Sequence, residues 1–585
     1  MVQFGAISIH LRSMQLVRMM ALKRISILAD NKFISKGGIL LSSIGLLLFT
    51  VLGLGGCKNV DKKSPQQVFH YNEDVSVTTL DPAFVRSQSE NWIVSQIFNG
   101  LVDLDAQLQP VPALAKSWDI SADLRNYTFH LRSDVNFCFV DKQGNITTRK
   151  MIASDVAYSL SRIADPATGS PGAWIFAGKI DSQLHRVFLA PNDSTFVLKL
   201  LSPTASLLGL LSTNFGYIVP KEYANLDKSY LARNPTGTGP FYVRRWEEEI
   251  KLVMRKNPHY HERDSQGIPL PYLDAINVTF VKNKQTAFMQ FAAGSYDFFN
   301  GLEGSFKDEL LTDHATLKPK YAQKMKAIIT PFLNTEYVGC YLGDYPGSTN
   351  WLKDVHLRRA LFYAVDKQKL VRFFRNGLGD PGDRGVVPPV LNTAENGKAL
   401  QANTSWQKAI SEFQLSGYAK QTKKPEILLS TTADYLDMMV YLQETWGRLG
   451  VKVKVDIQTG GMLRQLRNEG KLMLFRGSWI ADYPDAENFL ACYYGPYLSP
   501  MGPNYTHFEN ARFDEFYHLI EAGEGNQNGA SREQYIQQAN QILIDQAPVI
   551  PLYYDKSIRL IQPWVEGLQN DAANRLVLKR VKIKH

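Results

Sequence analysis

Three residues of the types that bind metal ions follow one another closely at His259, His261 and Glu262. His259 and His261 are two positions apart, so in an extended strand both imidazoles project from the same face, and imidazole is the commonest metal ligand in proteins. The group directly follows Asn257-Pro258, however, where a polar surface loop would have the same composition. We therefore interpret it as a loop and predict no metal site.

Other candidate motifs are incomplete. Asp103 and Asp105 begin like a calcium-binding loop, but the glycine expected at the sixth position and the glutamate expected at the twelfth are missing, so we predict a turn. The sequence GTGP at residues 237–240 is rich in glycine. Pro240, however, has no N–H to donate to a phosphate, and a turn into a strand at Phe241 is predicted instead. The chain also contains no G-x-S-x-G, H-E-x-x-H or P-loop sequence. The sequence therefore favours a protein that is not an enzyme and that uses no cofactor.

An apolar segment near the amino terminus predicts export from the cytoplasm. Residues 39–54 are uncharged and mostly apolar, and the longer segment before them carries nearly only positive charges. The segment ends at LGGC, residues 54–57, which resembles the lipobox of bacterial lipoproteins. The resemblance implies that residues 1–56 are a signal peptide, that Cys57 is lipidated and anchors the protein to the membrane, and that residues 57–67 are a tether. The alternative is a permanent transmembrane helix, which needs about 20 apolar residues.

The rest of the chain alternates between two hydrophobic patterns. Strand-like runs occur at residues 127–131, 195–200, 251–254 and 451–457. Apolar residues at three- and four-residue spacing predict helices over residues 153–163, 355–375, 434–449 and 532–544. Because helices and strands interleave, the fold class is α/β. A chain of 585 residues with 44% hydrophobic residues is expected to form two or three domains.

Cysteines and net charge exclude further classes. Beyond Cys57 the chain has Cys138, Cys340 and Cys492, and an odd number at wide spacing predicts no disulfide framework, only buried apolar-like side chains. The formal charge is +9, but residues 1–56 hold six Lys or Arg and one acid, which leaves +4 for the rest of the chain. Nucleic-acid binding needs clustered cations, so we exclude it.

Eight short motifs follow one another in a fixed order. They are LDP at residues 80–82, IFNGL at 97–101, PALAKSW at 112–118, YTFHLR at 127–132, GTGPF at 237–241, VHLRRAL at 355–361, WIADYPD at 479–485 and PVIPLYY at 548–554. In this order and spacing they resemble the extracellular solute-binding proteins of the peptide/nickel class. Within that class, the oligopeptide-binding receptors of ABC importers are the nearest match. The resemblance runs from about residue 68 to the carboxyl end.

The resemblance implies a two-lobed periplasmic-binding-protein fold (type II, Venus-flytrap) with an extra third domain, whose lobes close over a ligand by hinge motion. One lobe would combine residues 68–98, 237–335 and 556–585. The additional domain would span residues 99–236, and the opposite lobe residues 336–555. The chain would cross between the lobes near residues 331–341 and 553–559, which are therefore the predicted hinges.

The resemblance also assigns ligand-binding residues. Asp482, the acid of the Trp-x-x-Asp motif, would hold the α-ammonium group of a peptide. Arg476 matches a family arginine that reaches the carboxylate of short peptides. Ser478 and Ile480 would pair with the peptide backbone, and Trp479 would either stack on the ligand or pack in the core.

On the opposite lobe, Arg86 and Gln88 lie in the segment that corresponds to a second backbone-pairing region. An alternative from the residues alone is that Asp482 only caps the turn before Tyr483-Pro484-Asp485. A buried strand that ends in polar residues at 472–479 is nevertheless typical of ligand sites in α/β folds.

The implied function is that of a monomeric, lipid-anchored, extracytoplasmic receptor. It would capture short peptides and deliver them to an inner-membrane ABC permease with its ATPase subunits, without catalysing a reaction. A receptor of the same fold for a nickel chelate, haem or an oligosaccharide is the alternative within binding proteins. A peptidase built on this scaffold is the alternative among enzymes.

Overall fold

The computed structural model describes residues 66–227, 229–302, 304–345, 349–391, 404–523 and 531–584. The predicted signal peptide, Cys57 and most of the predicted tether lie outside the described residues. Residues Gln66–His585 form one compact unit. Within the ranges given above, no helix has both the length and the apolar character needed to cross a membrane.

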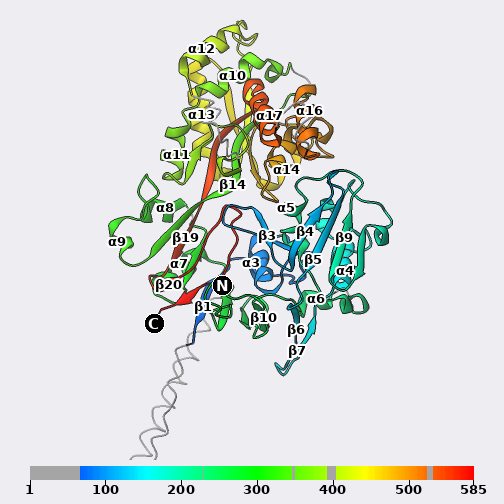
Figure 1. Cartoon of the computed structure of the whole chain (residues 1–585). Coiled ribbons are helices and arrows are strands. Elements are labelled where there is room, and N and C mark those ends of the chain that lie inside the picture. Colours follow the sequence, from blue (N-terminus) through cyan, green and yellow to red (C-terminus); the bar gives the residue numbers. More distant parts are fainter. Residues whose placement is uncertain are drawn as a thin grey trace, which may run out of the picture. The chain divides into compact units, whose positions relative to one another are not determined.

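An eleven-stranded mixed sheet runs through this unit (Figure 1). Its strands follow one another in the order β10 (Phe241–Glu247), β11 (Lys251–Lys256), β12 (Ala275–Thr279), β1 (Val68–Asn72), β13 (Phe298–Asn300), β19 (Val549–Ile561), β14 (Lys326–Cys340), β18 (Leu474–Ile480), β16 (Ile427–Thr431) and β17 (Val453–Ile457), with β15 (Gly379–Pro381) beside β19. The neighbours β10, β11 and β12 are antiparallel, whereas β1 pairs in parallel with β12 and with β13.

The long strands β14 and β19 connect the two ends of this sheet. They pair antiparallel from Lys326 opposite Ile561 to Gly339 opposite Val549. Their register shifts between Pro331 and Thr335, and it shifts again one residue further on. The two predicted crossing segments, 331–341 and 553–559, therefore lie side by side at an irregular point of one sheet.

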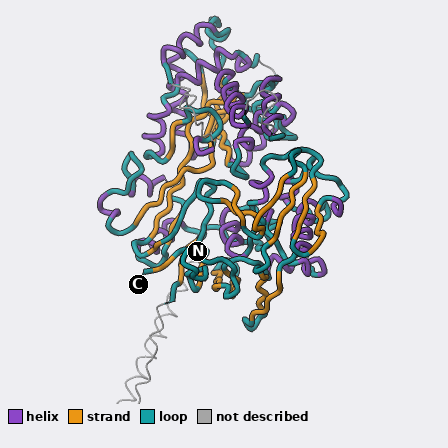
Figure 2. Tube along the Cα trace, in the orientation of Figure 1, coloured by secondary structure: helices purple, strands orange, loops and turns teal. Residues whose placement is uncertain are grey.

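Smaller sheets and most helices flank the large sheet (Figure 2). The small sheets are β4 (Ala115–Ile120), β5 (Asn126–Leu131), β9 (Thr195–Lys199) and β8 (Phe188–Asn192) in that order, and the pairs β2 (Val102–Leu104) with β3 (Pro110–Pro112), β6 (Asn136–Val140) with β7 (Ile146–Lys150), and β20 (Val565–Glu566) with β21 (Lys582–Ile583). The helices are α3 (Gln88–Ile97), α4 (Ala153–Ala164), α5 (Leu207–Leu211), α6 (Tyr230–Arg233), α7 (Lys284–Ala292), α8 (Gly304–Leu310), α9 (Pro319–Ala322), α10 (Val355–Ala364), α11 (Lys367–Arg375), α12 (Trp406–Leu415), α13 (Leu436–Leu449), α14 (Gly460–Asn468), α15 (Ala486–Leu490), α16 (Ala511–Glu521) and α17 (Arg532–Gln546).

Buried apolar side chains form separate clusters under these elements. Helix α4 packs on β8 and β9, and the cluster there includes Phe129 and Phe196. Another cluster surrounds Trp92 of α3, beneath β1 and β12. A third surrounds Trp446 of α13, which packs against β17. The small strand pairs share these clusters: Val565 of β20 and Ile583 of β21, for example, belong to the cluster of Trp92.

The predicted elements are confirmed except for one helix. Strands β5, β9, β11 and β17 and helices α4, α13 and α17 lie where the hydrophobic patterns predict them, and the three described cysteines are buried and free. The single helix predicted over residues 355–375 is wrong. Val365 and Asp366 are extended, and the Asp366 side chain accepts a hydrogen bond from the backbone N–H of Lys369, which begins a second helix.

The glycines of the GTGP motif allow close approach of two backbones. A Cβ atom on Gly237 would lie 1.9 Å from the carbonyl oxygen of Ile97, and one on Gly239 would lie 2.5 Å from the Ile97 carbonyl carbon. Strand β10 begins at Phe241, so the predicted turn into a strand is confirmed.

Candidate functional site

Asp482 lies in a short connection between strand β18 and helix α15. The Oδ1 atom of Asp485 accepts a hydrogen bond from the backbone N–H of Glu487 at 2.8 Å, so Asp485 caps α15. The backbone N–H of Asp482 donates to Oδ1 of Asn488 at 3.3 Å. The capping role that the sequence left open for Asp482 therefore belongs to Asp485.

The Asp482 carboxylate is available for a ligand. Its residue is exposed, and among the described residues it forms no ion pair. Partial burial of the carboxyl group raises the pKa of Asp482, and its hydrogen bond with Asn488 opposes that shift. A partly desolvated carboxylate without a cation is stabilised by a bound ammonium group.

A cavity of about 140 Å³ lies beside Asp482. Its walls come from segments that are far apart in the sequence. Gln88 of α3 and Ile480 of β18 line it together with Asp482, and Arg575 contributes from near the carboxyl end. The remaining lining residues near the hinge strands and α5 include Phe332, Leu333, Ser212, Thr213 and Asn214. The structure thus brings Gln88, Ile480 and Asp482 of the predicted site together.

Strand β18 has an open edge next to this cavity. On one edge it pairs antiparallel with β14, from Cys340 opposite Leu474 to Asn334 opposite Ile480. On the other edge β16 pairs only with Leu474 and Phe475. Residues 476–480 therefore have no strand on that edge within the described chain. An open edge of this kind can pair with an extended peptide through main-chain hydrogen bonds.

The other predicted residues of β18 already have partners within the protein. The Ser478 hydroxyl donates to Oδ1 of Asn334 at 2.9 Å, and the Trp479 indole N–H donates to Oδ1 of Asn488 at 2.8 Å. Trp479 is half-buried against an apolar cluster. Of the two roles left open for Trp479, packing is the one seen in this structure.

Arg476 is paired with a buried acid. One of its terminal nitrogens donates to the Glu336 carboxylate, and its guanidinium lies 3.6 Å from the centre of the Tyr435 ring. The side chain of Glu336 is 5% exposed and that of Arg476 is 16% exposed. Arg476 therefore belongs to the strand with the open edge, outside the lining of the cavity beside Asp482, and its charge is balanced by Glu336.

Arg86 and Gln88 lie just before and at the start of helix α3. Both are exposed. The Gln88 side chain donates to the carbonyl oxygen of Asn574 at 3.2 Å, whereas the backbone N–H of Arg86 donates to Glu90 at 3.3 Å. Gln88 lines the cavity beside Asp482, but Arg86 is not among its lining residues.

Two residues at the site could not be found from the sequence. Asn488 accepts hydrogen bonds from both Trp479 and the backbone of Asp482. Glu336 lies 140 positions from Arg476. Neither belongs to a recognisable motif, and only the pairing of β14 with β18 brings Glu336 to Arg476.

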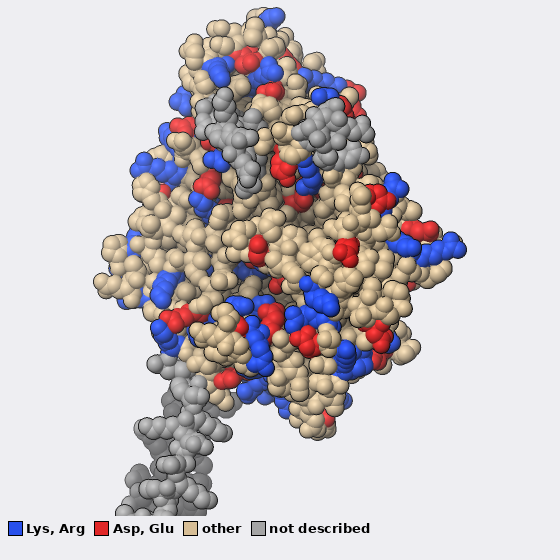
Figure 3. All heavy atoms as spheres, in the orientation of Figure 1, with Lys and Arg blue, Asp and Glu red and all other residues tan. Residues whose placement is uncertain are grey.

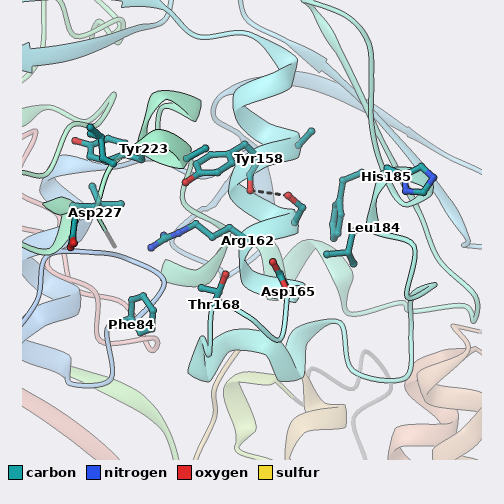
Figure 4. Close-up of a pocket in the computed structure, with 15 residues that line it drawn as sticks. Phe84, Tyr158, Arg162, Asp165, Thr168, Leu184, His185, Tyr223 and Asp227 are labelled. Atoms are coloured by element: carbon teal, nitrogen blue, oxygen red, sulfur yellow. Dashed lines mark hydrogen bonds between the residues drawn. The ribbon is translucent and has the colours of Figure 1, made fainter. Parts of the chain in front are cut away.

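A second, larger cavity of about 520 Å³ lies against helix α4 (Figure 4). Tyr158 and Arg162 of α4 line it together with Phe84, His185 and Tyr223. The Arg162 guanidinium forms an ion pair with buried Asp81, so it does not offer a free charge to this cavity. Its lining includes Phe188 of β8, the edge strand of a small sheet, but no residue of β18.

The group His259, His261 and Glu262, considered above as a possible metal site, forms contacts within the protein. Glu262 accepts from the ammonium group of Lys579 at 2.8 Å. Across the described ranges, no group of three His, Cys, Asp or Glu residues has an arrangement that could hold a metal ion. Burial lowers the pKa of His261 to about 4, with the charge of Glu262 opposing the shift.

The half-buried imidazole of His261 predicts a pH-dependent free energy of unfolding. The unfolded chain takes up this proton near pH 6.5, whereas the folded protein does so near pH 4. The unfolded state therefore binds more protons between these values. The free energy of unfolding should fall by up to about 3 kcal/mol from pH 6.5 to pH 4 and should be unaffected above that range. Urea unfolding at several pH values should show a flatter profile for His261→Gln. His314→Gln, at an exposed histidine, provides the control. The assignment would be contradicted if the dependence of the free energy of unfolding on pH changed in H314Q but not in H261Q.

Charges of both signs are mixed on the surface. On the face shown in Figure 3, Lys and Arg atoms alternate with Asp and Glu atoms. That face resembles the mixed surface of an ordinary soluble domain more than a nucleic-acid binding patch.

Comparison with known proteins identifies the family of this chain. The model of the bacterial extracellular solute-binding proteins, family 5 (middle), matches residues 109–499. The chain belongs to this family. The predicted resemblance and the predicted α/β fold class are both confirmed. The protein is a solute-binding component of an ABC importer and not an enzyme.

Individual relatives cover nearly the whole chain. A probable deoxycholate-binding periplasmic protein of Escherichia coli is 29% identical, over 86% of this chain and 91% of its own. The periplasmic oligopeptide-binding protein OppA of Salmonella typhimurium is 25% identical, over 95% of this chain and 99% of its own. Among solved structures, the murein tripeptide-binding protein MppA in its unliganded open form has a TM-score of 0.73 at 22% identity. That match covers 89% of this chain and 98% of MppA. Such relatives act outside the cytoplasm, as predicted here.

Proposed function

We propose that this protein captures short peptides with a free amino terminus and delivers them to the permease of an ABC importer. The observation that carries the proposal is the exposed carboxylate of Asp482 at the end of the open edge of β18. The peptide backbone would pair with residues 476–480, and the α-ammonium group would pair with Asp482. Main-chain pairing does not depend on side chains, so a receptor of this kind can serve many peptides.

Closure of the two predicted lobes would enclose the peptide. Residues 68–98, 237–335 and 556–585 would move as one lobe against residues 336–555, with residues 99–236 as the additional domain. The irregular register of β14 and β19 supports a hinge at this point, because interrupted pairing lowers the resistance of a strand to bending. Gln88 and Asp482, on opposite sides of the cavity, would approach the ligand together.

Mass spectrometry of molecules released by denaturation tests this function. The full chain would be purified in detergent under native conditions and then denatured. A mixture of short peptides is the expected result. A single non-peptide compound or metal complex would contradict the peptide assignment.

A non-peptide ligand is the alternative function. The 29% identical relative is named for deoxycholate. A preparation that releases one amphipathic small molecule would favour this alternative over peptides.

The second proposal is a lipid anchor on Cys57, which lies outside the described residues. In Cys57→Ala the acceptor thiol is absent, so lipidation should be lost completely. Cell fractionation should then recover the variant in the soluble extracytoplasmic or secreted fraction, and the parent protein in the membrane fraction. Cys138→Ala removes a buried thiol instead and should remain with the membrane. Membrane recovery of C57A in full yield would contradict the anchor.

A further inference from the structure

The pairing of two strands sets Arg476 and Glu336 side by side. Glu336 of β14 lies opposite Ser478 of β18, and Arg476 is two residues before Ser478. Residues in this diagonal relation lie on the same face of an antiparallel pair and are within reach of long side chains. Asn334 lies on the same face, diagonal to Ser478, and its side-chain oxygen accepts a hydrogen bond from the Ser478 hydroxyl.

Glu336 is fully engaged within the protein. Its residue is 4% exposed. One carboxylate oxygen accepts from the side-chain amide of Asn334 at 3.1 Å, and the other accepts from Arg476. Tyr553 lies opposite Glu336 on the third strand, β19, and is also buried. The carboxylate therefore has two donors within the protein and little contact with solvent.

A ligand carboxylate at Arg476 would meet this internal acid. Two carboxylates that share one guanidinium in a buried site repel each other, and one of them is driven to take up a proton. An unpaired arginine would attract a ligand carboxylate, but Arg476 is already paired with Glu336. A neutral group, by contrast, can approach the Arg476–Glu336 pair without adding charge.

We infer that Glu336 is a specificity-determining residue, which neutralises Arg476 on the open-edged strand β18 and removes its preference for ligands with a carboxylate there. The inference rests on the proposed peptide function and specifies its ligands. Such ligands have an ammonium group for Asp482 and an uncharged group at Arg476. Peptides with a blocked or more distant carboxylate meet this description.

Calorimetric titration of the full chain in detergent tests the inference. The probes are di- and trialanine, each as the free acid and as the carboxyl-terminal amide. The unmodified protein should bind each acid and its amide with affinities within about threefold. Glu336→Gln keeps the shape and the contact with Asn334 but frees the charge of Arg476. It should shift the ratio toward the acid by about tenfold or more, which is the gain expected for one charge-assisted hydrogen bond.

Two further variants separate this effect from altered folding. E336Q combined with R476Q removes both charges and should return the ratio to that of the unmodified protein. Glu412→Gln removes an acid paired with His356 elsewhere and should leave the ratio unchanged. The acid-to-amide ratio does not respond to a general loss of active protein, because both probes are affected equally.

The outcomes distinguish the inference from the function on which it rests. A tenfold preference of the unmodified protein for the acid, lost in the double variant, would overturn the inference and leave peptide binding intact. An unchanged ratio in E336Q would overturn it as well. Binding of no free-amine peptide by any of these proteins would overturn the proposed function, and the inference with it.

Discussion

Asp482→Asn should bind free-amine peptides about 150- to 5,000-fold more weakly than the unmodified protein. The substitution keeps the shape of the side chain and removes the charge that the α-ammonium group would meet. Once the lobes enclose the ligand, an ammonium group without a partner is strongly unfavourable, by about 3–5 kcal/mol. Asp482 is exposed, and no cation of the described residues forms an ion pair with its carboxylate. The loss of its charge should therefore appear in full as a loss of affinity for the peptide.

The measurement is titration with one peptide in two forms. The free-amine peptide should lose affinity in D482N, whereas its N-acetylated form should bind both proteins equally weakly. Asp437 is exposed on α13, and Asp437→Asn serves as the matched control with no expected effect. Equal affinity of D482N and the unmodified protein for the free amine would exclude Asp482 as its partner.

Glu487→Ala should lower the free energy of unfolding by about 2–6 kcal/mol. Glu487 is buried, and its two carboxylate oxygens accept hydrogen bonds from the hydroxyl groups of Tyr483 and Tyr517. Burial raises the pKa of Glu487, and the charge of Asp485 adds to the shift. Alanine leaves two buried hydroxyl groups without an acceptor, and each unsatisfied group is unfavourable by about 1–3 kcal/mol.

Denaturant unfolding of the full chain measures this loss. The matched control is Glu515→Ala on α16, where the acid is 55% exposed and pairs with Arg512. Its effect should remain below about 0.5 kcal/mol. A loss of less than about 1 kcal/mol in E487A would show that the two tyrosines find other partners. Because Tyr483 follows Asp482 directly, this network also holds the connection that carries Asp482 in place.

The hydrophobic patterns in the sequence predicted most helices and strands, but they did not predict the break between α10 and α11. The apolar spacing of α4, α13 and α17 specifies the face of each helix that is buried, so these helices follow from the sequence. The same spacing continues from α10 into α11, and hydrophobic periodicity alone does not reveal the break. The side chain of Asp366 competes for a backbone N–H and starts a new helix there.

The candidate site was only partly predictable for a different reason. Asp482 belongs to a motif, and its neighbours in sequence are also its neighbours in space. The partner of Arg476 depends on the register between two strands far apart in the chain, and a shift of one residue would turn Glu336 to the opposite face. Asn488 likewise acts only because α15 folds back toward the end of β18.

The open edge of β18 also exposes the protein to self-association. Unpaired main-chain groups on an edge strand can pair with the edge of another copy, which is how many aggregates begin. Here the unpaired stretch is only residues 476–480, and the charge of Asp482 lies just beyond its carboxyl end. Short length and flanking charge are the usual protections of such edges. Asp482 therefore also helps to keep separate copies of the protein apart.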